Sequence, residues 1–319
     1  MDSRAPRLHL ICERDVGLFS LIQQVAATIP WAIAENRVPI VRFGEKTCYW
    51  TPNGYRGRDT VWEYYFEPVV PSFPASVIPE HIRTTLALDH PSPFEVGYVA
   101  DGRTFVSSHF GDHPRLDGAT LLIPYEWEDP DERLRLEAKA VIDTFIRPWP
   151  YILRKVEDFF IRHLAGHHVI GVHARGTDAT SARELRAFRQ GSLVLARYVV
   201  EIERLLDAHP NAKVFVASDE QSSVSHLAGV FGDRVVTYHT LRHVGGQAAG
   251  QGPTGWIMPA YISADRDRAA RNGEDAIVEY LLLSRGDHLV HNGSSLARTV
   301  LLNAPRLPHT NTHRPKVQP

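Results

Sequence analysis

Short apolar runs alternate with longer amphipathic segments through the second half of the 319-residue sequence. A short apolar run bounded by turn residues predicts a buried strand, and apolar residues that recur about every 3.6 positions predict a helix. This pattern predicts strands at 168–172, 213–218, 234–239 and 287–292, and helices at 192–208, 220–230, 273–286 and 294–302. Such alternation is typical of a parallel sheet with helices on both faces.

The first half begins with the same order of elements. An apolar strand is predicted at 8–12, a helix at 21–36 and a second strand at 37–43. A strand, a turn, a helix and a strand in this order form a Rossmann-like unit. Gly17 lies in the predicted turn, where it would face a ligand, although a simple turn explains this glycine equally well.

Two further helices are predicted before the middle of the chain. The aromatic segment VWEYYFEP at 61–68 is interpreted as a short helix that packs its rings inward, rather than as a platform for a sugar. A longer helix is predicted at 128–146, where Asp129 can cap the first turn and Pro130 suits the start of the helix.

A proline-rich interruption, RPWP at 147–150, follows this helix. The length of the chain also suggests two domains. We therefore expect an N-terminal Rossmann-like domain at 1–148 and a C-terminal one at 149–303, followed by a flexible tail at 304–319. The tail contains four prolines and no apolar run.

The charges of the chain are almost balanced, with 35 basic and 37 acidic residues and a formal net charge of −2. Proteins that bind nucleic acid need a basic surface, so no nucleic-acid partner is expected. No apolar run reaches the length of a membrane-spanning helix, and the first residues lack a signal-peptide core. Cys12 and Cys48 do not form a disulfide framework. These features predict a cytoplasmic protein without membrane insertion.

Polar side chains follow three of the predicted strands in the second half. The first strand leads into His173, Arg175, Thr177 and Asp178, the second into Ser218, Asp219 and Glu220, and the last into Asn292, Gly293, Ser294 and Ser295. The carboxyl ends of parallel strands meet at one edge of a sheet, and ligands of such sheets bind there. We therefore expect these three groups to converge at one site.

The residue types at this edge suit a nucleoside diphosphate. Arg175 carries a planar fork of donors that matches phosphate oxygens. Ser294 and Ser295 begin a helix, where hydroxyls and free backbone N–H groups suit a phosphate. His173, together with a carboxylate, could hold the edge of a purine. Structural roles would also explain these residues, because an arginine at a strand end often forms an ion pair and serines often cap helices.

Three motifs in this region resemble those of a known family. IGVHARGTD is similar to the HxRxTD signature of the α-1,6-fucosyltransferase superfamily, which includes the nodulation fucosyltransferases and, more distantly, the protein O-fucosyltransferases. VFVASDE resembles the second motif of that family, and IVEYLLLSRGDHLVHNGSSLAR resembles the third. The three motifs occur in the family's order between residues 170 and 300, whereas the N-terminal half resembles the family only loosely.

This resemblance implies a fold and an activity. The implied fold is GT-B-like, with two Rossmann-like domains that face each other across a cleft. The implied activity is that of an inverting, metal-independent fucosyltransferase that uses GDP-fucose as its donor and needs no cofactor. The resemblance also implies donor contacts: His173 and Glu279 with guanine, Arg175 with the β-phosphate, Ser294 and Ser295 with the diphosphate, and Asp219 on the ribose side.

The sequence departs from the family pattern around its first motif. The second arginine of the family is replaced by Gly176, and a family lysine is replaced by Ala179. The family's proposed base aligns with Arg183, next to Glu184, so Glu184 is the candidate base here, although a surface role would also explain it. Asp178 is interpreted as a residue that braces the loop. We therefore expect an altered acceptor, either a small molecule or an oligosaccharide, in a bacterium.

The sequence is also consistent with two other functions. A nucleotide-sugar-binding protein that has lost catalysis is one alternative, and a glycosyltransferase with another nucleotide-sugar donor is a second. The histidine-rich segments HFGDH and GHHVIGVH offer metal ligands, but neither has the HExxH arrangement, so no metal site is expected. Their candidate ligands are His109, Asp112 and His113 in the first segment, and His167, His168 and His173 in the second.

Overall fold

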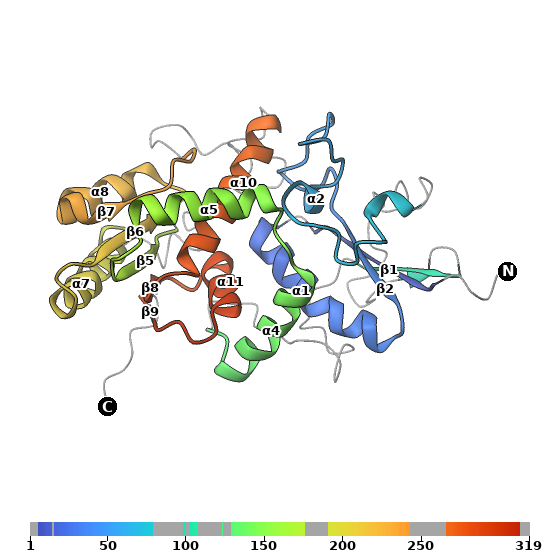
Figure 1. Ribbon diagram of the computed structural model, residues 1–319, viewed down its shortest axis with the longest axis horizontal. Coiled ribbons are helices and arrows are strands. Elements are labelled where there is room, and N and C mark those ends of the chain that lie inside the picture. Colours follow the sequence, from blue (N-terminus) through green and yellow to red (C-terminus); the bar gives the residue numbers. More distant parts are fainter. Residues whose placement is uncertain are drawn as a thin grey trace.

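Two β-sheets, one in each half of the chain, organise the computed structural model (Figure 1). The structure describes residues 6–14, 16–78, 98–99, 102–107, 123, 129–175, 191–242 and 266–312. Among these residues, four strands form the N-terminal sheet in the order β2-β1-β4-β3, and five form the C-terminal sheet in the order β7-β6-β5-β8-β9. The predicted α/β class with two Rossmann-like halves is therefore confirmed.

The N-terminal sheet is built around β1 (Leu8–Cys12), whose five residues are all buried. It pairs in parallel with β2 (Val38–Arg42) and β4 (Thr104–Ser107), while β3 (Tyr98–Val99) pairs antiparallel with β4. Helix α1 (Leu18–Ala34) connects β1 to β2 and contains Pro30. The predicted strand, helix and strand are thus present, with β1 at its predicted bounds.

Among its described residues, the N-terminal half also contains α2 (Val61–Tyr65), the 3-10 turn η1 (Ala75–Val77) and α4 (Glu132–Phe145). In α2, the side chains of Trp62, Tyr64 and Tyr65 are at most 1% exposed. The prediction that this aromatic segment packs inward is confirmed.

The predicted cap of α4 is wrong by two residues. The helix begins at Glu132, and the carboxylate of Asp131 accepts a hydrogen bond from the backbone N–H of Leu134 at 2.8 Å. Asp129 instead accepts a hydrogen bond from the side-chain amide of Asn311 at 3.0 Å. Asp129 and Asp131 flank Pro130, and aspartate suits the cap position equally well at either site. The choice between them therefore depends on a tertiary contact that the local sequence does not contain.

The C-terminal sheet is entirely parallel, and β5 (Val169–His173) lies at its centre. On one side lie β6 (Lys213–Ala217) and β7 (Val235–Val236), which is shorter than predicted. On the other side lie β8 (His288–His291) and β9 (His309–Asn311). The chain therefore moves outward from β5 to β7 and then returns to the opposite side of β5. This creates a topological switch point between β5 and β8, where ligands of open α/β sheets bind.

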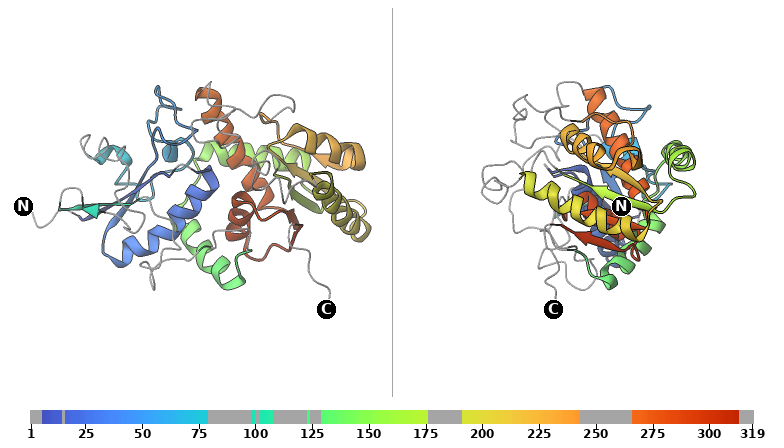
Figure 2. Two further views of the ribbon diagram at one scale, coloured as in Figure 1. Left: turned by 180° about the vertical axis from the view of Figure 1, so that it is seen from behind. Right: turned by 90° about the vertical axis from the view of Figure 1, so that its left-hand side faces the viewer.

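Helices cover both faces of this sheet (Figure 2). Ile170 and Val172 of β5 pack into a cluster with residues of α7 and α8, whereas Val169 belongs to a second cluster that includes α10 and α11. The described helices of this half are α5 (Pro150–His163), α7 (Gly191–Ala208), α8 (Gln221–Phe231) with the 3-10 turn η3 (Gly232–Arg234), α10 (Arg266–Leu283) and α11 (Ser295–Asn303).

Two features of these helices differ from the predictions. Helix α5 was not predicted, and α10 begins before the predicted residue 273. Proline at the first position of α5 starts a new helix directly after RPWP, so the interruption is a junction between two helices. The first turns of α10 are rich in arginine and lack an apolar period.

The predicted flexible tail from residue 304 is wrong for its first part. Residues 309–311 form β9, which pairs in parallel with β8, and Leu307 is buried. The backbone N–H of Thr312 also donates to the carbonyl of His291 at 2.7 Å. A short edge strand is held by backbone hydrogen bonds and needs no apolar run, which is why the sequence pattern did not show it. Residues 313–319 lie outside the described residues.

The two halves share one continuous hydrophobic cluster, which contains residues of α1 and α2 together with residues of α10 and α11. Helix α1 packs against α11, and α2 packs against α10. The division at residue 148 therefore remains a prediction.

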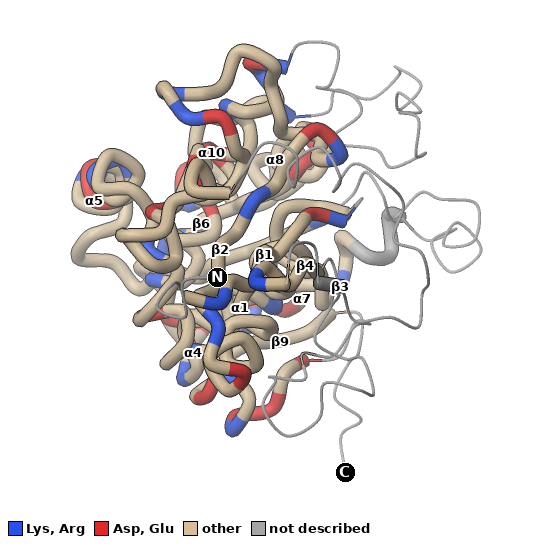
Figure 3. The backbone as a smooth tube through the Cα atoms, turned by 90° about the vertical axis from the view of Figure 1, so that its right-hand side faces the viewer, with Lys and Arg blue, Asp and Glu red and all other residues tan. Residues whose placement is uncertain are grey.

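Figure 3 shows basic and acidic residues interspersed along the described backbone. Among the described helices, none is both long and apolar enough to cross a bilayer.

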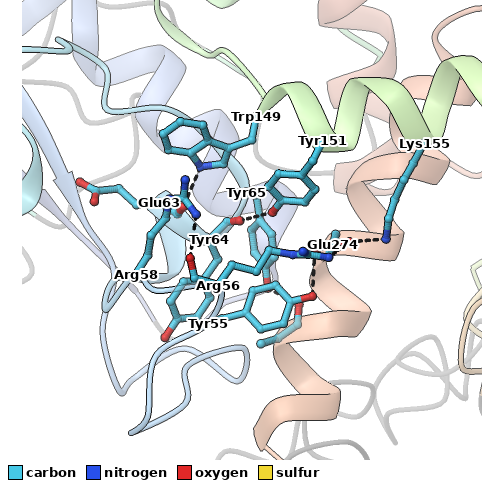
Figure 4. A network of polar contacts seen from close by, with 11 residues as sticks. Tyr55, Arg56, Arg58, Glu63, Tyr64, Tyr65, Trp149, Tyr151, Lys155 and Glu274 are labelled. Carbon is cyan, nitrogen blue, oxygen red and sulfur yellow. Dashed lines mark hydrogen bonds and ion pairs between the residues drawn. The ribbon is translucent and has the colours of Figure 1, made fainter.

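A buried carboxylate adds polar contacts between the halves (Figure 4). The side chain of Glu274 on α10 is 0% exposed and accepts hydrogen bonds from Tyr55 at 2.8 Å and from Arg56 at 2.7 and 3.1 Å. Lys155 on α5 also donates to it. Burial raises the pKa of Glu274, but the hydrogen bonds from Arg56, Lys155 and Tyr55 outweigh burial and lower it below its usual value. Glu274 is therefore ionised and links α10 both to α5 and to the segment before α2.

The close contact between α10 and α2 generates a prediction at Gly273. A Cβ atom at this position would lie 2.2 Å from the Tyr65 hydroxyl and 2.9 Å from the Tyr49 ring. Tyr65 cannot easily move, because its hydroxyl donates to the carbonyl of Ala270 at 2.7 Å. Gly273→Ala should lower the free energy of unfolding by about 1–3 kcal/mol, measured by chemical denaturation.

The matched control is Gly229→Ala in α8, where a Cβ atom would meet nothing within 4 Å. This change should raise stability by up to ~1 kcal/mol, because alanine favours helices more than glycine does. If both substitutions were stabilising, the described packing of α10 on α2 would be wrong.

Candidate functional site

The carboxyl ends of β5, β6 and β8 lie level with one another. His173 on β5 pairs in register with Ala217 on β6 and with His291 on β8. The segments that follow each strand, including Arg175 and Asp219, therefore leave the sheet at one edge. The described members of the three predicted groups thus lie at one edge, next to the switch point between β5 and β8, whereas Thr177 and Asp178 lie outside the described residues.

His173 is held by the first residue before α11. Its Nδ1 lies 2.9 Å from the hydroxyl of Ser294, and its ring is only 6% exposed. Ser294 caps α11 by accepting from the backbone N–H of Ala297 at 3.3 Å. A hydroxyl has one donor and two acceptor sites, so either Ser294 or the Nδ1–H of His173 can donate in this bond, and in both cases the contact fixes the orientation of the ring.

The charge state of His173 follows from its burial. Burial lowers the pKa of His173 to about 4, an effect that Asp219 opposes and Arg175 reinforces. The imidazole is therefore neutral at pH 7.

Arg175 leaves the sheet from a fixed backbone. Ala174 donates its N–H to the carbonyl of Ala217 at 3.1 Å and accepts from the hydroxyl of Ser218 at 2.6 Å. The side-chain amide of Asn292 donates to the carbonyl of Arg175 at 3.3 Å. Both neighbouring strands thus position this residue. Burial raises the pKa of Tyr49 in the N-terminal half, and the charge of Arg175 opposes that rise.

Glu279 has a partner that the sequence reasoning missed. Its carboxylate lies 3.2 Å from the Nη2 of Arg242, and both side chains are at most 8% exposed. Arg242 also donates to the carbonyls of Ser218 at 3.2 Å and Tyr238 at 2.8 Å. Burial raises the pKa of Glu279 to about 8, and Arg242 opposes this rise without cancelling it. Arg242 follows β7 in an irregular segment, so the hydrophobic periodicity of the sequence could not predict its contact with Glu279.

Ser295 lies where the N-termini of α1 and α11 meet. Its hydroxyl is 2.9 Å from that of Ser20, and its carbonyl accepts from the side chain of Gln23 at 2.7 Å. Arg298 also donates to the Ser295 hydroxyl at 3.2 Å. These contacts join the two halves. The Ser295 hydroxyl is therefore already engaged within the protein, and a role in binding a diphosphate stays a prediction.

Gly17 precedes α1 at the same meeting point of the halves. It occupies the N-cap position with φ −64° and ψ 154°, which any residue can adopt. A Cβ atom there would meet nothing within 4 Å. The fold of the described residues therefore gives no reason for glycine at this position, and the predicted approach of a ligand stays a hypothesis.

The remaining predicted residues are placed only in part. Asp219 directly follows Ser218 at the edge, whereas Asp178 and Glu184 lie outside the described residues, as do His109, Asp112 and His113. The histidines of GHHVIGVH go to different neighbours: His168 stacks on His209 with ring centroids 3.6 Å apart, and His173 contacts Ser294.

The buried state of Glu279 generates a prediction about stability and pH. Its pKa is raised in the folded chain, so the folded state binds more protons than the unfolded state between pH 4.5 and about 8. Its contribution to stability is fully present below the unfolded pKa and is lost as the pH rises through the folded pKa. The free energy of unfolding of the wild type, minus that of Glu279→Gln, should therefore fall over this interval, with a limiting slope of about 1.4 kcal/mol per pH unit.

Urea denaturation of both proteins at several pH values checks this result. A difference that stays flat or rises with pH would mean that Arg242 keeps Glu279 ionised.

Solved structures of fucosyltransferases share this architecture. No protein-family model matches the sequence, and no curated protein matches it. Fucosyltransferase NodZ from Bradyrhizobium is similar with a TM-score of 0.60 and 16% identity, covering 98% of this chain and 97% of that one. NodZ α-1,6-fucosyltransferase soaked with GDP-fucose has a TM-score of 0.55 and 18% identity, covering 94% of each chain. POFUT1 in complex with GDP-fucose has a TM-score of 0.54 and 12% identity, covering 97% of this chain and 99% of that one.

These similarities extend over nearly the whole chain at low sequence identity. They show that the two halves together share the fold of these structures, which is the GT-B-like fold implied by the motifs.

Proposed function

We propose that this chain is an inverting, metal-independent fucosyltransferase that uses GDP-fucose and a small-molecule or saccharide acceptor. The observation that carries the proposal is the convergence of His173, Arg175 and the N-terminus of α11 at the switch point of the C-terminal sheet. Similar structures co-crystallised with GDP, soaked with GDP-fucose or in complex with GDP-fucose support the choice of donor.

The reaction requires stabilisation of a leaving diphosphate. A hydroxyl oxygen of the acceptor forms a bond to the anomeric carbon as the bond from that carbon to the β-phosphate oxygen breaks. GDP leaves with growing negative charge, which the fork of Arg175 can neutralise through two hydrogen bonds. The N-terminus of α11 adds a positive dipole end at the same edge. The proton of the acceptor hydroxyl goes to a base, for which Glu184 remains the candidate.

Guanine recognition is proposed for His173 and Glu279. The Nε2 of neutral His173 can form a hydrogen bond with the base, and the carbonyl oxygen of the protonated Glu279 carboxyl group can accept from an N–H group of guanine. Glu279 also contacts Arg242, so the base would have to bind beside this pair. Asp219, which follows β6, is proposed for the ribose side.

The two alternatives use the same edge of the sheet. A nucleotide-sugar-binding protein without catalysis would bind GDP-fucose but release no GDP. A transferase for another nucleotide sugar would prefer a different nucleotide. Nucleotide binding and GDP release, measured on the same protein preparation, distinguish both alternatives from the proposed function.

The first experiment is a thermal-shift screen with GDP, UDP and dTDP at equal concentration. A ligand at 100 times its dissociation constant stabilises the folded state by about 2.7 kcal/mol, which gives a measurable rise in Tm. GDP should stabilise most. A larger shift with UDP or dTDP would reject guanine.

Release of GDP from GDP-fucose should persist in EDTA. Loss of this release on chelation, restored by Mg²⁺ or Mn²⁺, would reject metal independence.

Arg175 provides the sharpest test of the mechanism. Loss of one partner of a buried, hydrogen-bonded charge pair costs roughly 2–5 kcal/mol, so Arg175→Ala should slow GDP release by about 30- to 5,000-fold. Arg175→Lys keeps the charge but loses the fork and should recover only part of the rate. Calorimetry should show weaker GDP binding, with little change in Tm of the free protein.

Arg204→Ala on α7 is the matched control, because Arg204 is exposed and pairs with Glu201 away from the carboxyl edge. It should leave both GDP binding and release unchanged. Release by Arg175→Ala at the wild-type rate would mean that the proposed mechanism is wrong.

A further inference from the structure

A polar cluster beside the candidate site has the residue types of a metal centre. Asp129, His291 and His309 place three potential ligand atoms within 4.8 Å of one another. The Nε2 of His291 lies 3.1 Å from the Nδ1 of His309 and 3.8 Å from a carboxylate oxygen of Asp129. The cluster joins the segment before α4 to β8 and β9, and the ring of His291 is 0% exposed.

The position of one proton decides between a metal centre and a hydrogen-bond chain. The backbone N–H of Gly293 donates to the Nδ1 of His291 at 2.9 Å. A backbone amide can only donate, so Nδ1 carries a lone pair and the single proton of a neutral His291 lies on Nε2. That Nε2–H then donates to the Nδ1 of His309, which explains their separation of 3.1 Å.

A metal ion on Nε2 of His291 would conflict with this arrangement. The ion would displace the Nε2 proton and leave the ring with no N–H group, because Nδ1 already accepts from Gly293. Metal-bound histidines instead donate their second N–H to an acceptor. The geometry of the described residues therefore favours a chain of hydrogen bonds that runs from His309 through His291 to the backbone of Gly293.

This chain ends at the candidate donor site. Gly293 has a φ of +77°, a conformation that residues with a side chain rarely adopt, and it directly precedes Ser294. Ser294 caps α11 and contacts His173. On its other side, His291 is fixed by Thr312, whose backbone N–H and hydroxyl reach the His291 carbonyl at 2.7 and 3.1 Å.

We infer that His291 is a positioning residue for the nucleotide site: its Nδ1 holds the amide of Gly293 and thereby sets the turn that presents Ser294 to His173. This inference rests on the proposed function for its effect on GDP, but the hold on Gly293 is a property of the free protein. Burial lowers the pKa of His291 well below its usual value, so the ring keeps its acceptor at neutral pH.

Two substitutions separate the two nitrogen atoms of His291. In His291→Asn, the side-chain oxygen stands where Nδ1 stood and can accept from the N–H two residues later, as in an Asx-turn. In His291→Gln, the amide nitrogen can replace the Nε2 donor toward His309, but the acceptor for Gly293 is lost. The matched control is His9→Gln at another fully buried histidine, which contacts Ser107 in the N-terminal sheet at 2.7 Å.

The first readout is hydrogen exchange of the Gly293 amide in the free protein, followed by NMR. Exchange should be slow in the wild type and in His291→Asn, and faster in His291→Gln. The second readout is GDP affinity by calorimetry at a temperature where all variants are folded. His291→Gln should weaken GDP binding at least fivefold, about 1 kcal/mol for a buried donor left without a partner. His291→Asn and His9→Gln should bind GDP with close to wild-type affinity.

Several results would overturn the inference. These are fast exchange of the Gly293 amide in the wild type, equal GDP affinity in His291→Gln and the wild type, and equal weakening in the Asn and Gln variants. A rise in the wild-type Tm with Zn²⁺ alone that both variants lose would identify a metal centre instead. If His291→Gln does not fold, hydrogen exchange of the Gly293 amide in the wild type and the GDP affinity of His291→Asn still test the inference.

Failure of the proposed function gives a different result. In that case the wild type itself does not bind GDP, while the exchange pattern of Gly293 still reports whether His291 holds the turn.

Discussion

The central position of β5 determines where this protein can carry polar chemistry. All five of its residues are buried, with a strand on each side and helices on each face. A polar side chain within the strand would need a buried partner, whereas its carboxyl end opens onto the edge of the sheet. The parallel order brings the ends of β6 and β8 to the same level. The positions of His173 and Arg175 follow from this one constraint.

The edge is supported by polar contacts that cross between the two halves of the chain. Ser20 and Gln23 of α1 contact Ser295 at the start of α11, so the N-termini of these two helices are held together. Ser294 on the same turn contacts His173. The segment that caps α11 thus connects the sheet edge to the N-terminal half, and hydroxyl groups at this position stabilise the fold whether or not a ligand is bound.

Hydrophobic periodicity was sufficient to predict the elements that create the edge. The strands β5, β6 and β8 and the helices between them have clear apolar patterns, and the polar residues after each strand were visible directly. The pattern could not predict β9, because three polar residues held by backbone hydrogen bonds have no apolar signal. It could not select Asp131 over Asp129 as a cap, or pair Arg242 with Glu279, because these choices depend on contacts between distant segments. Asp178 and Glu184 lie outside the described residues.

The burial of Glu274 limits how the two halves can move. A hinge rotation that separated them would pull Tyr55 and Arg56 away from a carboxylate that is 0% exposed, and would leave Lys155 as its remaining charged partner among the contacts described. A carboxylate that loses hydrogen bonds in a buried position is costly unless water replaces them. The same rotation would expose the apolar cluster shared by α1, α2, α10 and α11. The two sheets should therefore behave as one rigid body, and a substrate would meet an edge whose geometry is set before it arrives.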